Sequence, residues 1–495
     1  MKRINSRGGA SMDAVLLMVI KLATTMLGFV ITRLLSQYLS VYDYGTYSQV
    51  LLIVSTVSSL TILGMMDGVN YFYSNEQNEK KRESYISTLF ALQSIVSAAA
   101  GCVVMLLSGP LCRYFDNPDV GRLLIFAVFL PFFQNLLNMF QVLLVSVGKA
   151  RMLAYRNLVV SLARLGAVVL VVTVARNVAV ILCTTVVLDV AQILFFGWIL
   201  QKNGCRIRIR DVDMGLIRKI FYYCVPMAVF TMINALNRDL DKYLVAICTD
   251  TETLAVYTNA SKALPFDIVM TSFCTVLLPE ITRRVGRKEN EAAAELYRLL
   301  LEIACISTAI LCFAALSASP QLMELFYSEK YISGLTVFCI YILVDLFRFT
   351  NMTLVLSAAG RTQTIMFLGF GSICVNAVLN VFLFYTVGIT GPAAATLLCT
   401  IGTGILMLRA SSRVLNSRIR LLMDLKYLGL FLAENILAVS FFWQLQKWLA
   451  GRGLHYVAIL VIVCGAYCCL MALLHGKRLL RDLKLVNRAG RTETK

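Results

Sequence analysis

The sequence has few charged residues and very few histidines. Of its 495 residues only 15% are charged and two are histidines, whereas 59% are hydrophobic. A typical water-soluble domain has about 25% charged and about 45–50% apolar residues. This composition therefore excludes an ordinary soluble enzyme, a disordered protein and a fibrous protein. The strands of a membrane β-barrel alternate apolar with polar residues, whereas the apolar residues here form long runs. The remaining class is a helical protein that crosses a membrane many times.

The sequence also lacks the motifs of ATP hydrolysis and of metal binding. It has no GxxxxGK[ST] phosphate loop, so we expect no ATP hydrolysis by this chain. Its 15 cysteines include no CxxC pair and lie mostly in apolar runs, which predicts reduced core residues. Asp211 and Asp213 form a DxD motif, as in some nucleotide-sugar sites, but they stand alone in a short basic loop. We expect no metal and no cofactor.

Apolar runs long enough to form membrane-spanning helices recur along the whole chain. The first follows Lys2, Arg3 and Arg7, but it is too long for a signal peptide and is expected to remain as a helix. The sequence therefore predicts an all-α polytopic membrane protein with about fourteen transmembrane helices. The predicted spans are residues 14–36, 45–66, 85–107, 122–146, 153–174, 178–200, 221–247, 253–279, 295–318, 333–357, 363–386, 388–408, 427–447 and 455–474.

The basic residues predict the orientation of these spans. With the N-terminus in the cytoplasm, 33 of the 46 lysines and arginines fall in inner segments, 6 in outer loops and 7 within spans. Cytoplasmic loops of membrane proteins are enriched in lysine and arginine. We therefore expect both termini in the cytoplasm, and the net charge of +18 needs no nucleic-acid partner.

The two halves of the chain resemble each other at an offset of 209–212 residues, which equals six spans. Such parallel repeats occur in secondary transporters, with a substrate cavity between two lobes. The prediction is an N-lobe at 1–200, a basic cytoplasmic loop at 201–220, a C-lobe at 221–408, a basic loop with two further helices at 409–474, and a basic cytoplasmic tail at 475–495. The matching positions are Arg33 with Lys242, Tyr47 with Tyr257, Phe115 with Phe326, and Gly148 with Gly360.

Several short motifs, in this order, resemble those of one transporter superfamily. They are the R-x-L…YG-x-Y stretch at Arg33–Tyr47, the G-K and G-R turns at Gly148 and Gly360, Pro226, the Asp241-Lys242 pair with residues 256–264, Pro279-Glu280, and residues 325–331. The chain resembles the multidrug/oligosaccharidyl-lipid/polysaccharide flippase superfamily, and within it the polysaccharide transporter branch of O-antigen, capsule and teichuronic-acid flippases. This branch usually has Asp-Arg where the chain has Asp241-Lys242, so the bidentate fork of arginine is missing there.

The resemblance implies a function and a location. It implies that the chain moves an undecaprenyl-pyrophosphate-linked oligosaccharide from the inner to the outer leaflet of a bacterial cytoplasmic membrane, by alternating access of two six-helix lobes and without bond chemistry. The implied partners are this lipid-linked substrate, membrane lipid, and the polysaccharide polymerase and glycosyltransferases of the same pathway. No nucleic acid is expected among them.

Charged residues within the predicted spans indicate where a substrate path could lie, because such residues are costly in a membrane and usually face a cavity or a partner. Six of them are predicted to be ion-paired or to line the cavity: Arg164, Asp189, Asp241, Lys242, Asp345 and Arg348. Asp345 and Arg348 are three residues apart on one helix, as are Asp239 and Lys242. Arg164 and Asp189 lie at similar depth on adjacent spans. Glu302, Asp345 and Glu434 are candidates for ion or proton coupling.

Three cations have no evident partner in the sequence. Lys21 has no acidic residue one helical turn away, Asp267 is at a poor spacing from Lys262, and Arg238 can only share Asp241 with its neighbours. In the fold that the resemblance implies, their helices border the central cavity. Fixed cations would offset the desolvation of a pyrophosphate. We therefore predict Lys21, Arg238 and Lys262 as the binding site of the pyrophosphate.

Three other functions compete with this one. A multidrug or cation extruder of the same superfamily should have an acidic cavity, whereas the cations without an evident partner in the sequence suggest a basic one. A flippase of the lipid II or sporulation type would also have a basic cavity, and composition does not separate it. A membrane-embedded polymerase or ligase would carry a large outer loop, which this sequence lacks.

Overall fold

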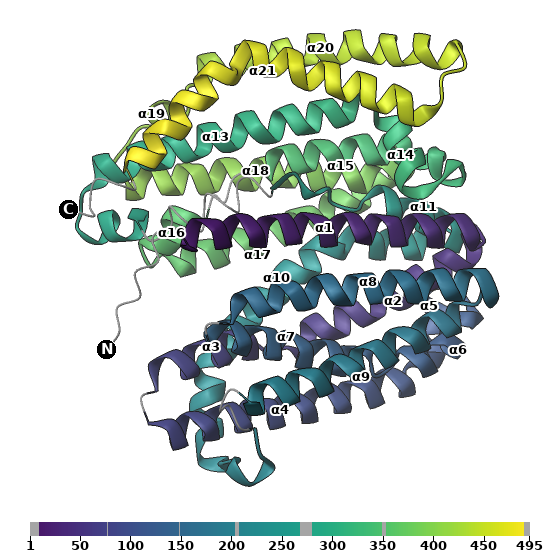
Figure 1. Ribbon diagram of the computed structural model, residues 1–495, viewed down its shortest axis with the longest axis vertical. Coiled ribbons are helices and arrows are strands. Elements are labelled where there is room, and N and C mark those ends of the chain that lie inside the picture. Colours follow the sequence, from purple (N-terminus) through teal and green to yellow (C-terminus); the bar gives the residue numbers. More distant parts are fainter. Residues whose placement is uncertain are drawn as a thin grey trace. The chain divides into compact units, whose positions relative to one another are not determined.

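The computed structural model describes residues 9–76, 78–147, 149–202, 207–267, 280–348 and 353–489. Within these ranges every regular element is a helix and none is a strand (Figure 1). This confirms the predicted all-α class. Helices are the expected solution for so apolar a chain, because a helix satisfies its backbone hydrogen bonds within a single segment.

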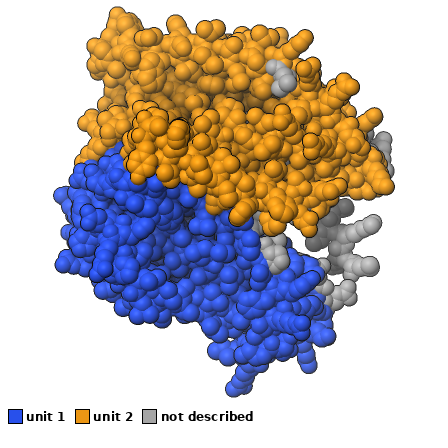
Figure 2. Space-filling model, turned by 180° about the vertical axis from the view of Figure 1, so that it is seen from behind, with its two compact units in different colours: residues 1–256 blue, residues 257–495 orange. Residues whose placement is uncertain are grey.

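The chain divides into two compact units, residues 1–256 and 257–495, which Figure 2 colours blue and orange. The first unit is built largely from long helices joined by short turns. It contains α1 (Gly9–Tyr38), α2 (Val41–Thr61), α3 (Met65–Asn75), α4 (Glu79–Leu106), α5 (Ser108–Tyr114), α6 (Pro118–Ala127), α7 (Leu130–Ser146), α8 (Ala150–Val174), α9 (Val178–Lys202), the 3-10 helices η1 (Ile209–Asp211) and η2 (Met214–Leu216), α10 (Ile217–Cys248) and the start of α11 (Thr251–Ala260).

The second unit begins within α11. Its other elements are η3 (Pro265–Asp267), α13 (Asn290–Ser317), α14 (Ser319–Tyr327), η4 (Glu329–Gly334), α15 (Leu335–Phe347), α16 (Leu354–Ala358), α17 (Thr362–Val387), η5 (Gly388–Thr390), α18 (Gly391–Val414), α19 (Ile419–Leu422), α20 (Leu425–Gly451) and α21 (Tyr456–Ala489). The helix α10, which the sequence predicts as the first of the C-lobe, packs against α2 and α3 of the first unit. The division into two lobes of six helices stays a prediction.

Nine helical stretches in the described ranges are long and apolar enough to cross a membrane, or up to eleven if each of two bent helix pairs forms one span. One of the nine, Gln363–Val414, contains both α17 and α18. The predicted spans 253–279 and 333–357 extend into residues outside the described ranges. The total of fourteen therefore stays a prediction, whereas the many apolar helices support a multi-pass membrane protein.

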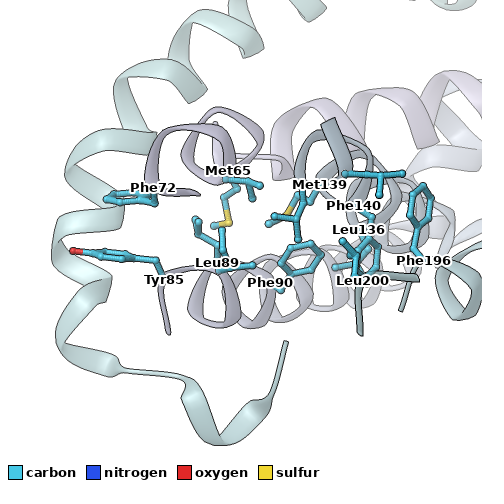
Figure 3. Close-up of a cluster of buried hydrophobic side chains, with 14 of the residues drawn as sticks. Met65, Phe72, Tyr85, Leu89, Phe90, Leu136, Met139, Phe140, Phe196 and Leu200 are labelled. Carbon is cyan, nitrogen blue, oxygen red and sulfur yellow. The ribbon is translucent and has the colours of Figure 1, made fainter. Parts of the chain in front are cut away.

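The core of the first unit lies where α3, α4, α7 and α9 meet. Figure 3 shows its buried side chains, among them Met65, Leu89 and Met139. Aromatic rings stack within it: Phe72 lies 4.4 Å from Tyr85 and Phe140 lies 5.6 Å from Phe196, between ring centroids. Tight packing of this kind associates helices in a membrane, where lipid removes most of the hydrophobic driving force. These four helices therefore form the rigid part of the unit.

The core of the second unit is the helix α13. Eighteen of its 28 residues are buried, and it packs against α15, α20 and α21. Small residues such as Ala293, Ala304 and Ala309 are almost fully buried along it. They let neighbouring helices approach closely. Thus α13 is enclosed by protein, although its composition also suits a lipid-facing span.

Two spans of the first unit are bent, and side-chain amides satisfy the backbone at one of the bends. The pairs α2/α3 and α6/α7 bend by 43° and 42°. At the α2/α3 break Leu63 and Gly64 have φ of 45° and 66°, which ends the regular helix. Gln93 of α4 donates to the carbonyl oxygen of Thr61 at 3.0 Å, and Asn135 of α7 donates to that of Ser58 at 3.2 Å. The carbonyls near the break thus have partners from two other helices.

The predicted span 253–279 is not one continuous helix, and this part of the prediction is wrong. The helix α11 ends at Ala260, and the turn η3 starts at Pro265. Proline has no backbone N–H and disfavours helical geometry in the residue before it. The N–H of Leu264 donates instead to the Asp345 carboxylate at 2.8 Å. Lys262 therefore lies in a break between helical segments.

The close approach of α2 to α11 depends on Gly45, the glycine of the YG-x-Y motif. A Cβ at this position would lie 2.4 Å from the Thr251 carbonyl oxygen and 2.7 Å from its Cγ2. Around it, Asn117 donates to Thr46 Oγ1 at 2.9 Å and to Gln49 Oε1 at 2.8 Å. The motif that carries part of the resemblance is thus explained by helix packing.

We expect Gly45→Ala to lower the free energy of unfolding by about 1–3 kcal/mol, because overpacking forces the backbone at Thr251 to move. The midpoint of thermal unfolding of the protein in detergent measures this. Gly28→Ala is the matched control, since a Cβ there meets nothing within 4 Å. Alanine favours helix over glycine, so the control should not be less stable. Equal midpoints for the two variants would show that the α2–α11 contact does not constrain the fold.

Candidate functional site

The three cations of the predicted pyrophosphate site are all exposed to the outside of the protein. Lys21 lies in α1 and Arg238 in α10, both in the first unit, whereas Lys262 lies between α11 and η3 in the second. Among the side chains that the structure describes, Lys21 forms no salt bridge, and its backbone carbonyl accepts from the Thr24 and Thr25 hydroxyls at 2.9 Å. An anion could reach each of these ammonium and guanidinium groups.

Arg238 belongs to a cluster of charges on α10. Its guanidinium lies 3.2 Å from the Asp239 carboxylate, which also accepts from the Lys242 ammonium at 2.6 Å. Asp239 is almost buried, whereas the Arg238 side chain is 58% exposed. The ion pair of Arg238 is thus with Asp239, and Asp241 is buried. One carboxylate thus holds two cations, and together with Asp241 the four charges of this cluster sum to zero.

Arg164 of α8 and Asp189 of α9 form an ion pair, as their similar depth on adjacent spans suggests. The Arg164 guanidinium lies 3.1 Å from Asp189 Oδ1, and Asp189 is 1% exposed. Gln192 donates to the same carboxylate at 3.1 Å and in turn accepts from Arg156. Two donors therefore compensate Oδ1 of the desolvated carboxylate, whereas its Oδ2 has no hydrogen-bond partner among the described residues.

Arg156 is a buried charge within the predicted span 153–174 that the sequence pattern did not single out. It is 8% exposed in α8 and lies over the Phe196 ring at 4.7 Å, besides its hydrogen bond to Gln192. The spacing of Arg156 from Arg164 could have indicated that the two lie on the same side of the helix. Arg156 and Arg164 are eight residues apart, which puts them close to one helix face. Asp189 and Gln192, three apart, similarly share a face of α9.

Asp345 has a structural role besides its predicted pairing. It lies 4.0 Å from the Arg348 guanidinium on α15, and its other oxygen accepts from the N–H of Leu264. The side chain is largely buried, while Arg348 is more exposed. A carboxylate that accepts a backbone N–H in a broken helix replaces the lost helical bond. The residue therefore fixes the segment that carries Lys262.

The other two carboxylates considered for ion coupling are also paired. Glu302 of α13 contacts Arg478 of α21, and Glu434 of α20 lies 2.9 Å from His475 of α21. Arg478 also lies 3.6 Å from Asp424 and 3.5 Å above the ring of Tyr427. The cluster borders a small pocket of about 30 Å³ between α13 and α20. These contacts fasten the C-terminal helix to the core of the second unit.

The described ranges contain no group of three or more His, Cys, Asp or Glu side chains that could hold a metal ion. Asp213 of the DxD motif instead accepts from the N–H of Gly215 at 2.8 Å, where it caps η2. This hydrogen bond is the ordinary role of aspartate before a helical turn.

Comparison with solved structures identifies the fold. The structure of the lipid II flippase MurJ in an inward closed conformation matches with a TM-score of 0.70 and 14% identity, over 94% of this chain and 100% of that one. The MATE multidrug transporter DinF-BH matches with a TM-score of 0.60 and 14% identity, over 84% and 99%. A MOP superfamily transporter from Pyrococcus furiosus matches with a TM-score of 0.59 and 13% identity, over 82% and 95%.

Comparison at the level of sequence identifies the family. No curated protein matches the chain. A family model described as polysaccharide biosynthesis protein matches residues 30–335, which is more than half of the chain. The matched range includes the YG-x-Y stretch at Gly45 and the charged cluster of α10. The chain therefore belongs to the polysaccharide biosynthesis protein family, and its fold is that of the MurJ and MATE transporters.

Proposed function

We propose that the protein is a flippase for an undecaprenyl-pyrophosphate-linked oligosaccharide, which it moves from the inner to the outer leaflet of a bacterial cytoplasmic membrane during cell-surface polysaccharide biosynthesis. The observation that carries this proposal is the match to the polysaccharide biosynthesis family over residues 30–335. The fold shared with a lipid II flippase supports it. We propose that both termini lie in the cytoplasm, and the distribution of basic residues among the loops supports this.

The transport mechanism proposed is alternating access of two lobes, without ATP hydrolysis. The lack of a phosphate-binding loop in the sequence supports this. The sugar unit would be supplied by glycosyltransferases on the cytoplasmic side and consumed by a polymerase on the outer side, which makes both partners of the same pathway. In such a cycle the protein only has to lower the cost of carrying a charged headgroup through the membrane.

We propose further that Lys21, Arg238 and Lys262 hold the pyrophosphate during this passage. Their exposure supports the assignment, because a bound anion needs access to the cation. Arg238 is held by Asp239 with its side chain still more than half exposed. The pairs Arg164–Asp189 and Asp345–Arg348 are assigned to the scaffold, since each has a carboxylate that is almost buried.

A leaflet assay in liposomes tests the proposed function. The purified protein is reconstituted with a fluorescent undecaprenyl-pyrophosphate-linked glycan, and a membrane-impermeant quencher reports the share that changes leaflet. Faster exchange than in protein-free liposomes is the expected result. Exchange of lipid II alone from a panel would make the chain a peptidoglycan-precursor flippase. Uptake of a cationic dye without glycan exchange would make it a drug extruder, and either result contradicts the proposal.

A further inference from the structure

The segment between α9 and α10 presents two large apolar side chains to the outside of the protein. Ile209 of η1 is 92% exposed and Met214 of η2 is 73% exposed. Arg208 and Arg210, on either side of Ile209, are exposed as well. In Figure 1 this teal segment extends beyond α4 at the lower edge of the first unit. Apolar side chains beside cations are typical of segments that lie on an anionic membrane surface.

Hydrogen bonds to α4 hold this segment in place. The N–H of Arg208 donates to Ser87 Oγ at 3.2 Å, and the N–H of Asp213 donates to Thr88 Oγ1 at 3.1 Å. The segment thus has a defined backbone that packs on α4, with η1 and η2 as its two short helical turns. The outward position of Ile209 and Met214 follows from this backbone.

The charge around the two apolar side chains is positive. Lys202 and residues 207–219 contain five basic residues and only two acidic ones, Asp211 and Asp213. Asp213 already accepts from Gly215. The segment follows one apolar helix of spanning length and precedes another predicted span, so it meets a membrane surface at both ends. The loop charges predict that this is the cytoplasmic surface, where the leaflet carries anionic lipids.

We propose that residues 207–216 form a docking loop for the anionic lipids of the inner leaflet. Ile209 and Met214 enter the apolar edge of the bilayer, and Arg208 and Arg210 bind lipid phosphates with Arg218 beside them. A lipid surface fits better than a soluble partner, because the loop is held next to the bilayer by the two helices that it joins. This inference does not depend on the substrate of the transporter.

Tryptophan placed in the loop tests the proposal. The full-length Ile209→Trp variant is reconstituted in liposomes with brominated phosphatidylglycerol or brominated phosphatidylcholine at equal mole fraction. The signal of the unchanged protein, which has three tryptophans, is subtracted. We expect the added fluorescence to be quenched by both lipids and more strongly by phosphatidylglycerol. Glu79→Trp, at the exposed start of α4, is the control that aqueous acrylamide should quench instead.

The charge requirement is tested by adding Arg208→Gln and Arg210→Gln to the Ile209→Trp protein. The ratio of quenching by the two brominated lipids should then fall to about one, since each basic residue near an anionic surface contributes on the order of a fivefold preference. High salt should have the same effect. Equal quenching by the two lipids before the arginines are changed would overturn the proposal. Quenching of the Ile209→Trp protein by acrylamide and by neither lipid would also overturn the proposal. It would show that the loop faces water, where a soluble partner could bind it.

Discussion

Replacement of Lys21, Arg238 and Lys262 by glutamine is expected to reduce glycan exchange in liposomes to the level of protein-free membranes. A hydrogen bond to a charged group contributes about 1.5 kcal/mol or more. Three such hydrogen bonds together correspond to roughly a thousandfold change in the dissociation constant, because every 1.4 kcal/mol changes it about tenfold. The effect should fall on transport and leave folding intact, because the three side chains are exposed. The leaflet assay measures the rate, and size-exclusion chromatography measures the folded yield.

A second triple variant controls for the change in net charge. Arg122, Arg176 and Arg452 are exposed cations in or next to predicted outer loops, and their change to glutamine removes the same number of charges. This control should transport at the rate of the unchanged protein. Full transport by the Lys21/Arg238/Lys262 variant would discard the site and keep the function. Equal loss in both triple variants would show that net charge matters and these positions do not.

Arg478→Gln is expected to destabilise the second unit strongly. The change removes the cation that contacts Glu302, whose side chain is only 10% exposed, and it also removes the contact with the Tyr427 ring. Breaking a buried ion pair costs about 3–5 kcal/mol. Arg298 still lies 4.0 Å from Glu302, so we expect a loss of about 2–4 kcal/mol in the free energy of unfolding. Thermal unfolding in detergent measures it.

Two further variants isolate the Arg478–Glu302 interaction. Lys477→Gln changes an exposed cation next to Arg478 on α21 and should alter stability by less than about 0.5 kcal/mol. Glu302→Gln combined with Arg478→Gln should be more stable than Arg478→Gln alone, because the uncompensated carboxylate is gone. If the double variant is no more stable than the single one, the loss comes from packing on Tyr427 and the ion pair contributes nothing.

The sequence predicts local features of this molecule better than distant ones. Long apolar runs predict helices because lipid offers the backbone no hydrogen-bond partner, and a helix satisfies its own N–H and C=O groups. Every element in the described ranges is helical. Charges three residues apart on one helix, such as Asp345 and Arg348, can be paired from spacing alone. The contact of Arg238 with the neighbouring Asp239 does not follow from such spacing, because adjacent residues on a helix do not normally face each other.

Contacts between residues far apart in the sequence could not be predicted. Arg478 and Glu302 are 176 residues apart, and nothing in either local pattern indicates that α21 packs on α13. The break before Pro265 could be predicted only in part. Proline within an apolar run indicates a kink, but only the folded unit shows that Asp345 accepts the N–H of Leu264 there. For the same reason the sequence named Lys262 as a site residue without showing that it lies outside a helix.

The amides at the α2/α3 bend have a mechanical consequence. Gln93 on α4 and Asn135 on α7 both donate to carbonyl oxygens of α2, so neither helix can slide along α2 without breaking a hydrogen bond. The Ser58 carbonyl would keep the N–H of Ile62, whereas the Thr61 carbonyl would lose its side-chain donor. In hydrocarbon each bare group costs several kcal/mol. These hydrogen bonds resist straightening of the bend. In the proposed transport cycle we therefore expect α2, α3, α4 and α7 to move together, and the bending to occur in other segments.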